Sequence, residues 1–272
     1  MQPARCLNCE QTILPEQKFC SQCGQKTDIH RLDFHYLVHE AVHSITHADK
    51  SIFNLLAKLS YQPGHVARNF LAGKRKRFLS PLNFYLIIIG VFVFLLSTFK
   101  TFEQPTNFAA WRAGISQIKD PIERDRKLQK IDRSENAMKF MSKNSNLVNL
   151  LAATPLVSLI FFLFYRKRAY NFTEHLVSNF YFSGFAASVF MLLIAPVINI
   201  FQSTNVYLTG IACFLLFELF YRSIAYYQLM NIKGTRHYLY ALFASFTTVI
   251  CWILLSRWVI NTYIETGFKS FF

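Results

Sequence analysis

Long apolar segments separated by short polar ones dominate the chain after residue 81. Leu82 to Phe99 is a run of 18 residues without a charged side chain, and that length suffices for an α-helix to cross a bilayer. Similar apolar segments lie at residues 147–165, 176–201, 206–227 and 238–260. The pattern predicts an all-α, multi-pass transmembrane helix bundle of about five spans.

The polar segments divide the chain into three parts. Residues 1–28 contain two C-x-x-C motifs and are predicted to form a small zinc ribbon. We predict cytoplasmic amphipathic helices with a juxtamembrane basic segment at 29–81, and a five-span transmembrane domain at 82–272. Within the last part, residues 100–146 are polar and mixed in charge, with only a faint helical stripe. They are predicted to form an extracytoplasmic helical loop.

The most regular amphipathic segment reads H-Y-L-V-H-E-A-V-H-S-I-T-H, at residues 35–47. Its four histidines recur every four residues, so on a helix they fall at about 0°, 40°, 80° and 120°, in one stripe. Apolar side chains occupy the opposite side. The segment predicts an amphipathic helix whose polar face is made of imidazoles.

Two shorter amphipathic helices are expected between this segment and the first span. One covers Ile52 to Leu59 and ends at Pro63-Gly64, and the other covers Val66 to Leu71 and ends at Gly73. The basic run Lys74 to Arg77 follows directly. Its position next to an apolar span predicts contact with anionic lipid headgroups.

Composition and charge agree with a membrane location. The chain is 53% hydrophobic, contains 29 Phe and carries a net charge of +14. Because the basic residues flank apolar spans, the predicted partner is a lipid bilayer with anionic headgroups, and nucleic acid is disfavoured. Arg166 to Arg168 and Lys233 to Arg236 lie in short connections on the same side as the N-terminal part. The positive-inside rule therefore predicts a cytoplasmic N-terminus and a C-terminus outside.

Two C-x-x-C motifs form the most specific chemical pattern in the chain. Cys6 with Cys9 and Cys20 with Cys23 supply four thiolates, the ligand set of a tetrahedral zinc site. Four cysteine ligands leave no open coordination position, so this zinc is expected to be structural. The ribbon could then present a surface to a cytoplasmic protein partner.

The histidine segment contains a second metal pattern. His39-Glu40-x-x-His43 reads H-E-x-x-H, in which two histidines bind zinc and the glutamate acts as general base. His47 extends the stripe. Glu174 or His175, at the start of the third span, could supply a further ligand for a second zinc ion. The alternative is that the stripe is only a polar face, solvated or lying at the headgroups.

Glu218 is the acidic residue that lies well within a span. Intramembrane carboxylates are often functional, but Arg222 follows four residues later, at the spacing of a helical ion pair. We favour the ion pair.

The order of these motifs resembles an uncharacterised family of bacterial zinc-ribbon, multi-pass membrane proteins that is catalogued as a domain of unknown function. The resemblance rests on the cysteines, on H-E-x-x-H-x-x-x-H-x-D-K at residues 39–50, and on the Pro63-Gly64, Gly73 to Phe78 and Pro81 positions. Glu174-His175-Leu176-Val177 also resembles the family, whose members often carry a further histidine where this chain has Asn179 and Phe180. The resemblance implies a location in the bacterial inner membrane and brings no established activity.

Three functions remain open at this point. The favoured one is a membrane-anchored binding or regulatory protein. A zinc-dependent hydrolase or protease using Glu40 is the first alternative, so whether the chain catalyses a reaction stays open. A small-solute or ion transporter is the second, with Glu218 and the polar Asn and Ser residues of the spans lining a path, although the chain shows no clear inverted repeat.

Overall fold

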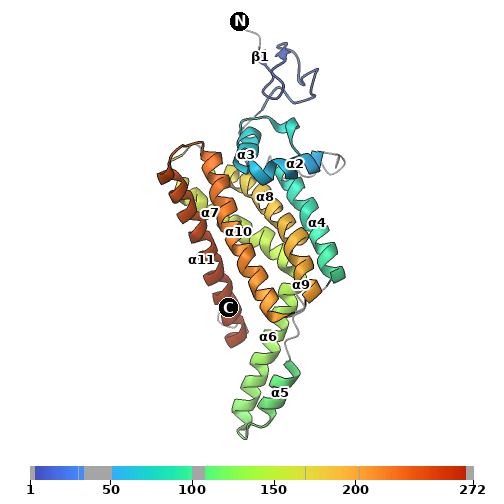
Figure 1. Ribbon diagram of the computed structural model, residues 1–272, viewed down its shortest axis with the longest axis vertical. Coiled ribbons are helices and arrows are strands. Elements are labelled where there is room, and N and C mark those ends of the chain that lie inside the picture. The colour runs from blue at the N-terminus through green and yellow to red at the C-terminus, as the bar shows by residue number, and fades with distance from the viewer. Residues whose placement is uncertain are drawn as a thin grey trace.

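The protein is a bundle of long helices with a small cysteine-containing module at one end (Figure 1). The computed structural model describes residues 4–29, 31–33, 51–99, 108–168, 170–201 and 203–267. The predicted histidine helix at 35–47 lies outside the described residues.

The cysteine module, residues 4–29, contains very little regular structure. Strand β1 (Ala4–Arg5) pairs antiparallel with β2 (Thr12–Ile13), and Phe19 forms a single bridge with Lys26. Its buried interior consists of Cys6, Ile13 and Cys20, with Cys9 and Cys23 packed against them. An interior this small cannot stabilise a fold by hydrophobic burial alone.

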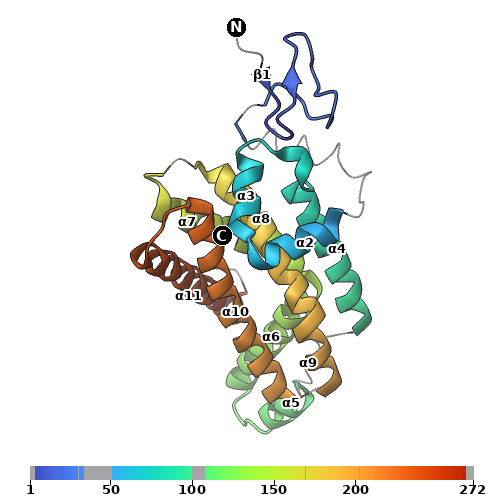
Figure 2. The same ribbon diagram turned by 45° about the horizontal axis from the view of Figure 1, so that its top comes forward.

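Three short elements lie across the end of the bundle that faces the module (Figure 2). They are α2 (Ser51–Tyr61), α3 (Pro63–Leu71) and the 3₁₀ turn η1 (Arg75–Arg77). Pro63 ends α2 as predicted, and it also begins α3, a position where its missing N–H has no cost. The buried side of α3 packs on α8 and α10.

The membrane part contains the apolar helices at the predicted places. They are α4 (Pro81–Phe99), α7 (Thr154–Tyr165), α8 (Phe172–Val189) continuing through η3 (Phe190–Ile194) into α9 (Ala195–Phe201), α10 (Thr204–Met230) and α11 (Thr235–Thr266). In the described residues, four helices are long and apolar enough to cross a membrane, and Leu150–Tyr165 is a shorter apolar helix. The predicted all-α multi-pass bundle of about five spans is confirmed, with the shorter helix in the place of the second span.

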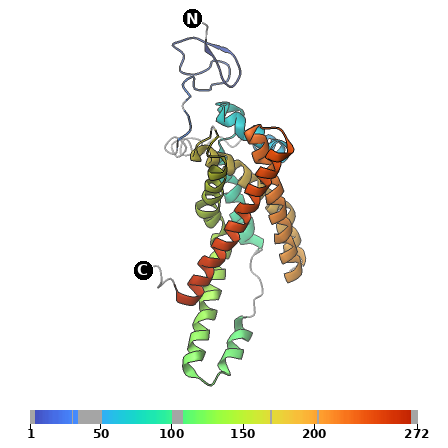
Figure 3. The same ribbon diagram turned by 90° about the vertical axis from the view of Figure 1, so that its left-hand side faces the viewer.

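The segment before α7, predicted to be a helical loop, contains two regular helices. Helix α5 (Phe108–Ser116) turns back onto α6 (Pro121–Val148), and α6 continues through the π-helical segment η2 (Asn149–Ala153) into α7. The α5–α6 hairpin extends beyond the other helices at the end away from the cysteine module (Figures 1 and 3). Its polar helix α6 is thus a direct extension of an apolar one.

The core of the bundle is aromatic on the side near the module. Tyr226 of α10 stacks on Phe161 of α7 with ring centroids 3.5 Å apart, and Phe182 of α8 packs edge-on against the same tyrosine. All three are completely buried. By contrast, large apolar side chains on the outer faces, such as Leu193 and Leu254, are exposed. Apolar groups facing outward around an apolar core are what a bilayer environment requires.

Candidate metal centre and buried polar network

The four predicted cysteines form one cluster. The sulfur atoms of Cys6, Cys9, Cys20 and Cys23 all lie within 4.8 Å of one another. Cys6 Sγ is 3.6 Å from Cys23 Sγ, and Cys9 Sγ is 3.5 Å from Cys20 Sγ. A tetrahedral ion with metal–sulfur bonds of about 2.3 Å separates its sulfurs by about 3.8 Å, so the four residues can hold one metal ion.

Both C-x-x-C segments fold in the same way, which is why their sulfurs converge. Cys6 N–H donates to the carbonyl of Gln11 and Cys20 N–H donates to that of Gln25, both at 2.8 Å. The residue after each second cysteine has a left-handed backbone, with φ 64° at Glu10 and 67° at Gly24. Glycine suits this conformation, whereas a glutamate there carries backbone strain.

The backbone around the cysteines also changes their acidity. The N–H of Cys23, with that of Gln22, lowers the pKa of the Cys20 thiol to about 6. The N–H of Gln11 acts in the same direction on Cys9, but desolvation and the neighbouring cysteine sulfurs outweigh it and raise its pKa to about 12. Ionisation of one thiol therefore raises the pKa of the neighbouring thiol, unless a metal cation compensates the negative charge.

The cysteine module is attached to the bundle by specific contacts. The side-chain carbonyl of Gln25 accepts hydrogen bonds from the backbone N–H groups of Arg75 at 3.0 Å and Lys76 at 3.3 Å. Leu7 lies over Gly73, where an added Cβ would come within 2.9 Å of its Cδ1. Gly73 has φ +94°, which an L-residue rarely adopts, so the backbone conformation here favours glycine, whereas the exposed Leu7 side chain can rotate away from an added Cβ.

The predicted second metal site is only partly within the described residues. His39, Glu40, His43 and His47 lie outside them. Glu174, a predicted ligand, lies within the described residues, and its carboxylate already has hydrogen-bond partners. It accepts hydrogen bonds from Nε and Nη2 of Arg31 at 2.9 and 2.8 Å and from the backbone N–H of Asn171 at 2.7 Å. It completes a capping box at the start of α8.

His175, the other predicted ligand, is completely buried. Its Nδ1 lies 3.2 Å from the hydroxyl of Tyr226, and its Nε2 has no hydrogen-bond partner among the described residues. The second metal site therefore stays a prediction.

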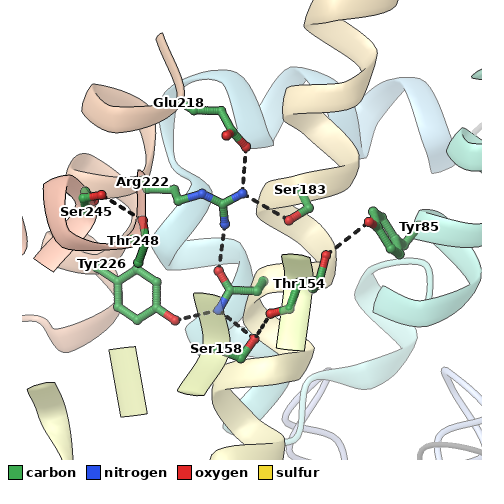
Figure 4. A network of polar contacts seen from close by, with 10 residues as sticks. Tyr85, Thr154, Ser158, Ser183, Glu218, Arg222, Tyr226, Ser245 and Thr248 are labelled. Atoms are coloured by element: carbon green, nitrogen blue, oxygen red, sulfur yellow. Dashed lines mark hydrogen bonds and ion pairs between the residues drawn. The ribbon is translucent and has the colours of Figure 1, made fainter. Parts of the chain in front are cut away.

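The intramembrane ion pair is confirmed and belongs to a larger network (Figure 4). Arg222 Nη2 donates to Glu218 Oε1 at 2.7 Å and to Ser183 Oγ at 3.2 Å, and Arg222 Nη1 donates to Asn179 Oδ1 at 2.9 Å. Asn179 in turn donates to Tyr226 at 2.8 Å and to Ser158 at 3.1 Å. The network connects α7, α8 and α10 through side chains alone.

Asn179 is the central residue that sequence reasoning did not select. In the sequence it is named as a departure from the histidine common in the resembling family and is otherwise included only among the polar residues of the spans. An amide inside an apolar span is itself a signal, because a buried polar group in a membrane must find a partner. Its partner Arg222 lies 43 residues away in the sequence.

Fold and cysteine cluster together define a multi-pass, all-α membrane protein with a four-cysteine candidate metal centre. Residues 49–93 match a family described as "Protein of unknown function (DUF3667)", which confirms the resemblance to a catalogued uncharacterised family. The match covers α2, α3, η1 and part of α4, the elements at the module-facing end. No curated protein and no solved structure matches the chain significantly.

Proposed function

We propose that this chain is a binding or regulatory protein of the bacterial inner membrane, with a zinc ion folding the cysteine module into a recognition unit for a cytoplasmic protein. The observation that carries the proposal is the closed set of four sulfurs within 4.8 Å, placed outside the bundle and bonded to it through Gln25. A closed four-thiolate set supports a structural role for the ion, since it leaves no position for a substrate.

The surface of the cysteine module suits a protein partner better than nucleic acid. Residues 4–29 carry three basic and three acidic side chains, which gives no electrostatic attraction to nucleic acid. Leu14 and Phe19 are 62% and 54% exposed on this neutral surface. Exposed apolar and aromatic side chains of this kind are the anchors of protein interfaces.

The neighbouring basic segment supports a cytoplasmic, membrane-proximal position. Lys74 to Arg77 precedes α4 directly, and the Lys58 ammonium and Arg77 guanidinium lie 5.3 and 5.8 Å from the ring of Phe78. Cations gathered around an aromatic ring at the start of a span suit the headgroup layer of an anionic leaflet. We assign the module, this segment and the N-terminus to the cytoplasmic side.

Metal counting on purified full-length protein tests the zinc assignment. We expect Cys20→Ser to remove one zinc ion per chain and to unfold residues 4–29, while the protein stays in the membrane with its helix content unchanged. Zinc content equal to that of the wild type would contradict the structural centre.

The same measurement decides between the binding protein and the hydrolase. His39→Ala with His43→Ala removes a second zinc ion only if the histidine segment binds metal. In that case Glu40→Gln distinguishes catalysis from a structural site, because it keeps the zinc and stops hydrolysis. A wild-type zinc content in the double variant rules out the H-E-x-x-H hydrolase.

Site-specific photocrosslinking tests the partner surface. A photoreactive amino acid at Leu14 or Phe19 should capture the same protein in cells, and Cys20→Ser should abolish that capture. Position Trp111, at the opposite end of the molecule, is the control. Equal capture at all three positions, or capture that survives Cys20→Ser, would overturn the recognition role of the module.

A further inference from the structure

A cavity of about 420 Å³ lies inside the membrane bundle next to the ion pair. Helices α4, α6, α7, α8, α10 and α11 all contribute to its wall. Apart from the polar groups at one end, the lining is apolar and aromatic, with Phe92, Phe190, Phe214 and Trp252 among its residues. This volume lies in the range of pockets that hold small organic ligands.

The cavity is long and closed at the polar end. Its lining on α10 runs from Tyr207 to Arg222, which is about 22 Å along a helix axis. One turn beyond Arg222, the fully buried stack of Tyr226 on Phe161 fills the bundle. The ion pair therefore forms the inner end of an apolar channel that points away from the cysteine module.

The hydrogen bonds at this end leave one carboxylate oxygen available as an acceptor. Arg222 is engaged by Glu218, Asn179 and Ser183 (Figure 4). Glu218 accepts through Oε1, and no described residue donates to its Oε2, although Glu218 lines the cavity. The polar end thus offers a carboxylate oxygen to a ligand that brings its own hydrogen-bond donor.

The charges of Glu218 and Arg222 limit which head group a ligand can carry. Glu218 and Arg222 form a neutral pair, so an ammonium head would leave one uncompensated positive charge in an apolar site. An anionic head would leave one uncompensated negative charge beside the neutral pair and would also face the free oxygen of Glu218. A hydroxyl head donates to Glu218 without adding charge.

We propose that this cavity is a binding site for a neutral, single-chain amphiphile, whose hydroxyl head donates to Glu218 and whose hydrocarbon chain lies along α10 toward Tyr207. The site lies in the membrane bundle and does not depend on metal in the cysteine module, so this inference goes beyond the proposed function.

Trp252 gives a direct probe of occupancy, because it lines the cavity. Replacing Trp111 and Trp258 by Phe leaves Trp252 as the single tryptophan of the full-length protein. We expect 11-bromo-1-undecanol to quench its fluorescence with saturation. The matched control keeps Trp258 alone, which is 56% exposed on the outer surface and should show only quenching proportional to the bromoalcohol in the micelle.

Head-group analogues test the chemistry of the polar end. At pH 8, 11-bromoundecanoate and 11-bromoundecylammonium should bind at least about tenfold more weakly than the alcohol, because each brings a charge that the neutral pair does not compensate. The glyceryl ester of 11-bromoundecanoic acid distinguishes two sources of a hydroxyl head. Saturation by the ester points to a neutral membrane lipid, and saturation by the alcohol alone points to a free long-chain alcohol; both support the site.

A cavity-filling variant removes the site without touching the ion pair. Ala187→Phe places a ring in the cavity and should abolish saturable quenching, while Leu193→Phe adds the same ring on an exposed surface and should not. Unchanged melting temperatures show that both variants fold. Quenching of Trp252 that stays proportional like that of Trp258, saturation unaffected by Ala187→Phe, or tighter binding of either charged analogue would overturn the proposal.

Discussion

Gly64 lies where the family-matching segment comes into close contact with the end of α10. A Cβ there would lie 2.2 Å from the carbonyl oxygen of Ala225 and 2.3 Å from the backbone nitrogen of Leu229. These neighbours are backbone atoms of α10 and cannot rotate away. The Gly64 N–H also donates to Gln228 Oε1 at 3.1 Å. The glycine therefore allows α3 to lie directly against the end of α10.

Gly64→Ala should lower the free energy of unfolding by about 2–3 kcal/mol, because α3 must move away from α10. Thermal unfolding of the detergent-purified variant measures this effect. Gly90→Ala in α4 is the matched control: its Cβ meets nothing within 4 Å, and alanine favours the helix. Equal melting temperatures for the two variants would contradict the close packing at Gly64.

The Glu218–Arg222 pair makes a second prediction at the residue scale. Glu218→Ala leaves a buried guanidinium without its counter-charge and should cost about 3 kcal/mol of stability. The double variant Glu218→Ala with Arg222→Met should recover much of this loss, although Asn179 then lacks a donor. Melting temperatures of both variants decide the point. A double variant less stable than Glu218→Ala would show that Arg222 stabilises the bundle mainly through its other partners.

Among the elements, the α5–α6 hairpin depends on ion pairs more than on a core. Helix α5 has no buried residue. Arg112 of α5 instead pairs with Asp132 at 2.8 Å and with Glu135, both on α6. At the same level, α6 is also tied to the end of α11, where Lys130 pairs with Glu265 at 2.5 Å and Arg133 donates to the carbonyl of Ile264 at 3.1 Å. Acid should therefore loosen α5 before it affects α6.

Lys139 and Arg112 hold the pKa of Glu135 below its ordinary value of 4.5. A carboxylate with a lowered pKa stabilises the folded state above its ordinary pKa, and this contribution is lost as the pH falls through the lowered value. We expect Trp111 emission, measured with Trp252 and Trp258 replaced by Phe, to change as the pH falls below 4.5. Glu135→Gln should remove that transition. A transition of the same size in the variant would assign it to another group.

At the scale of the whole molecule, the number of apolar helices and the positions of the basic residues predict on which side of the membrane each end of the chain lies. We predict that the four long apolar helices and the shorter one make five crossings, which would leave the ends of the chain on opposite sides. The basic residues at 74–77, 166–168 and 233–236 predict that the N-terminus lies in the cytoplasm. A reporter fused after residue 272 should be active outside the cytoplasm, and one fused after residue 167 should be active inside. Cytoplasmic activity at residue 272 would contradict the five-span topology.

The sequence alone determined the features that depend on neighbouring residues. A span must satisfy its backbone hydrogen bonds internally, so its length and apolarity are sufficient to locate it. The same locality made the Glu218–Arg222 pair predictable from a spacing of four, and the cysteine cluster from two C-x-x-C turns. The continuation of α6 into α7 was missed, because the polar residues before 147 resemble a loop by composition.

The tertiary structure decided everything that depends on residues far apart in the chain. Arg31 donates hydrogen bonds to Glu174, which lies 143 positions later in the sequence. Gln25 accepts a hydrogen bond from the backbone N–H of Arg75. Asn179 accepts a hydrogen bond from Arg222 and donates one to Tyr226. The cavity beside Glu218 exists only because several helices leave space between their side chains. Periodicity along one helix shows which face is polar, but the packing of all the helices determines what that face meets.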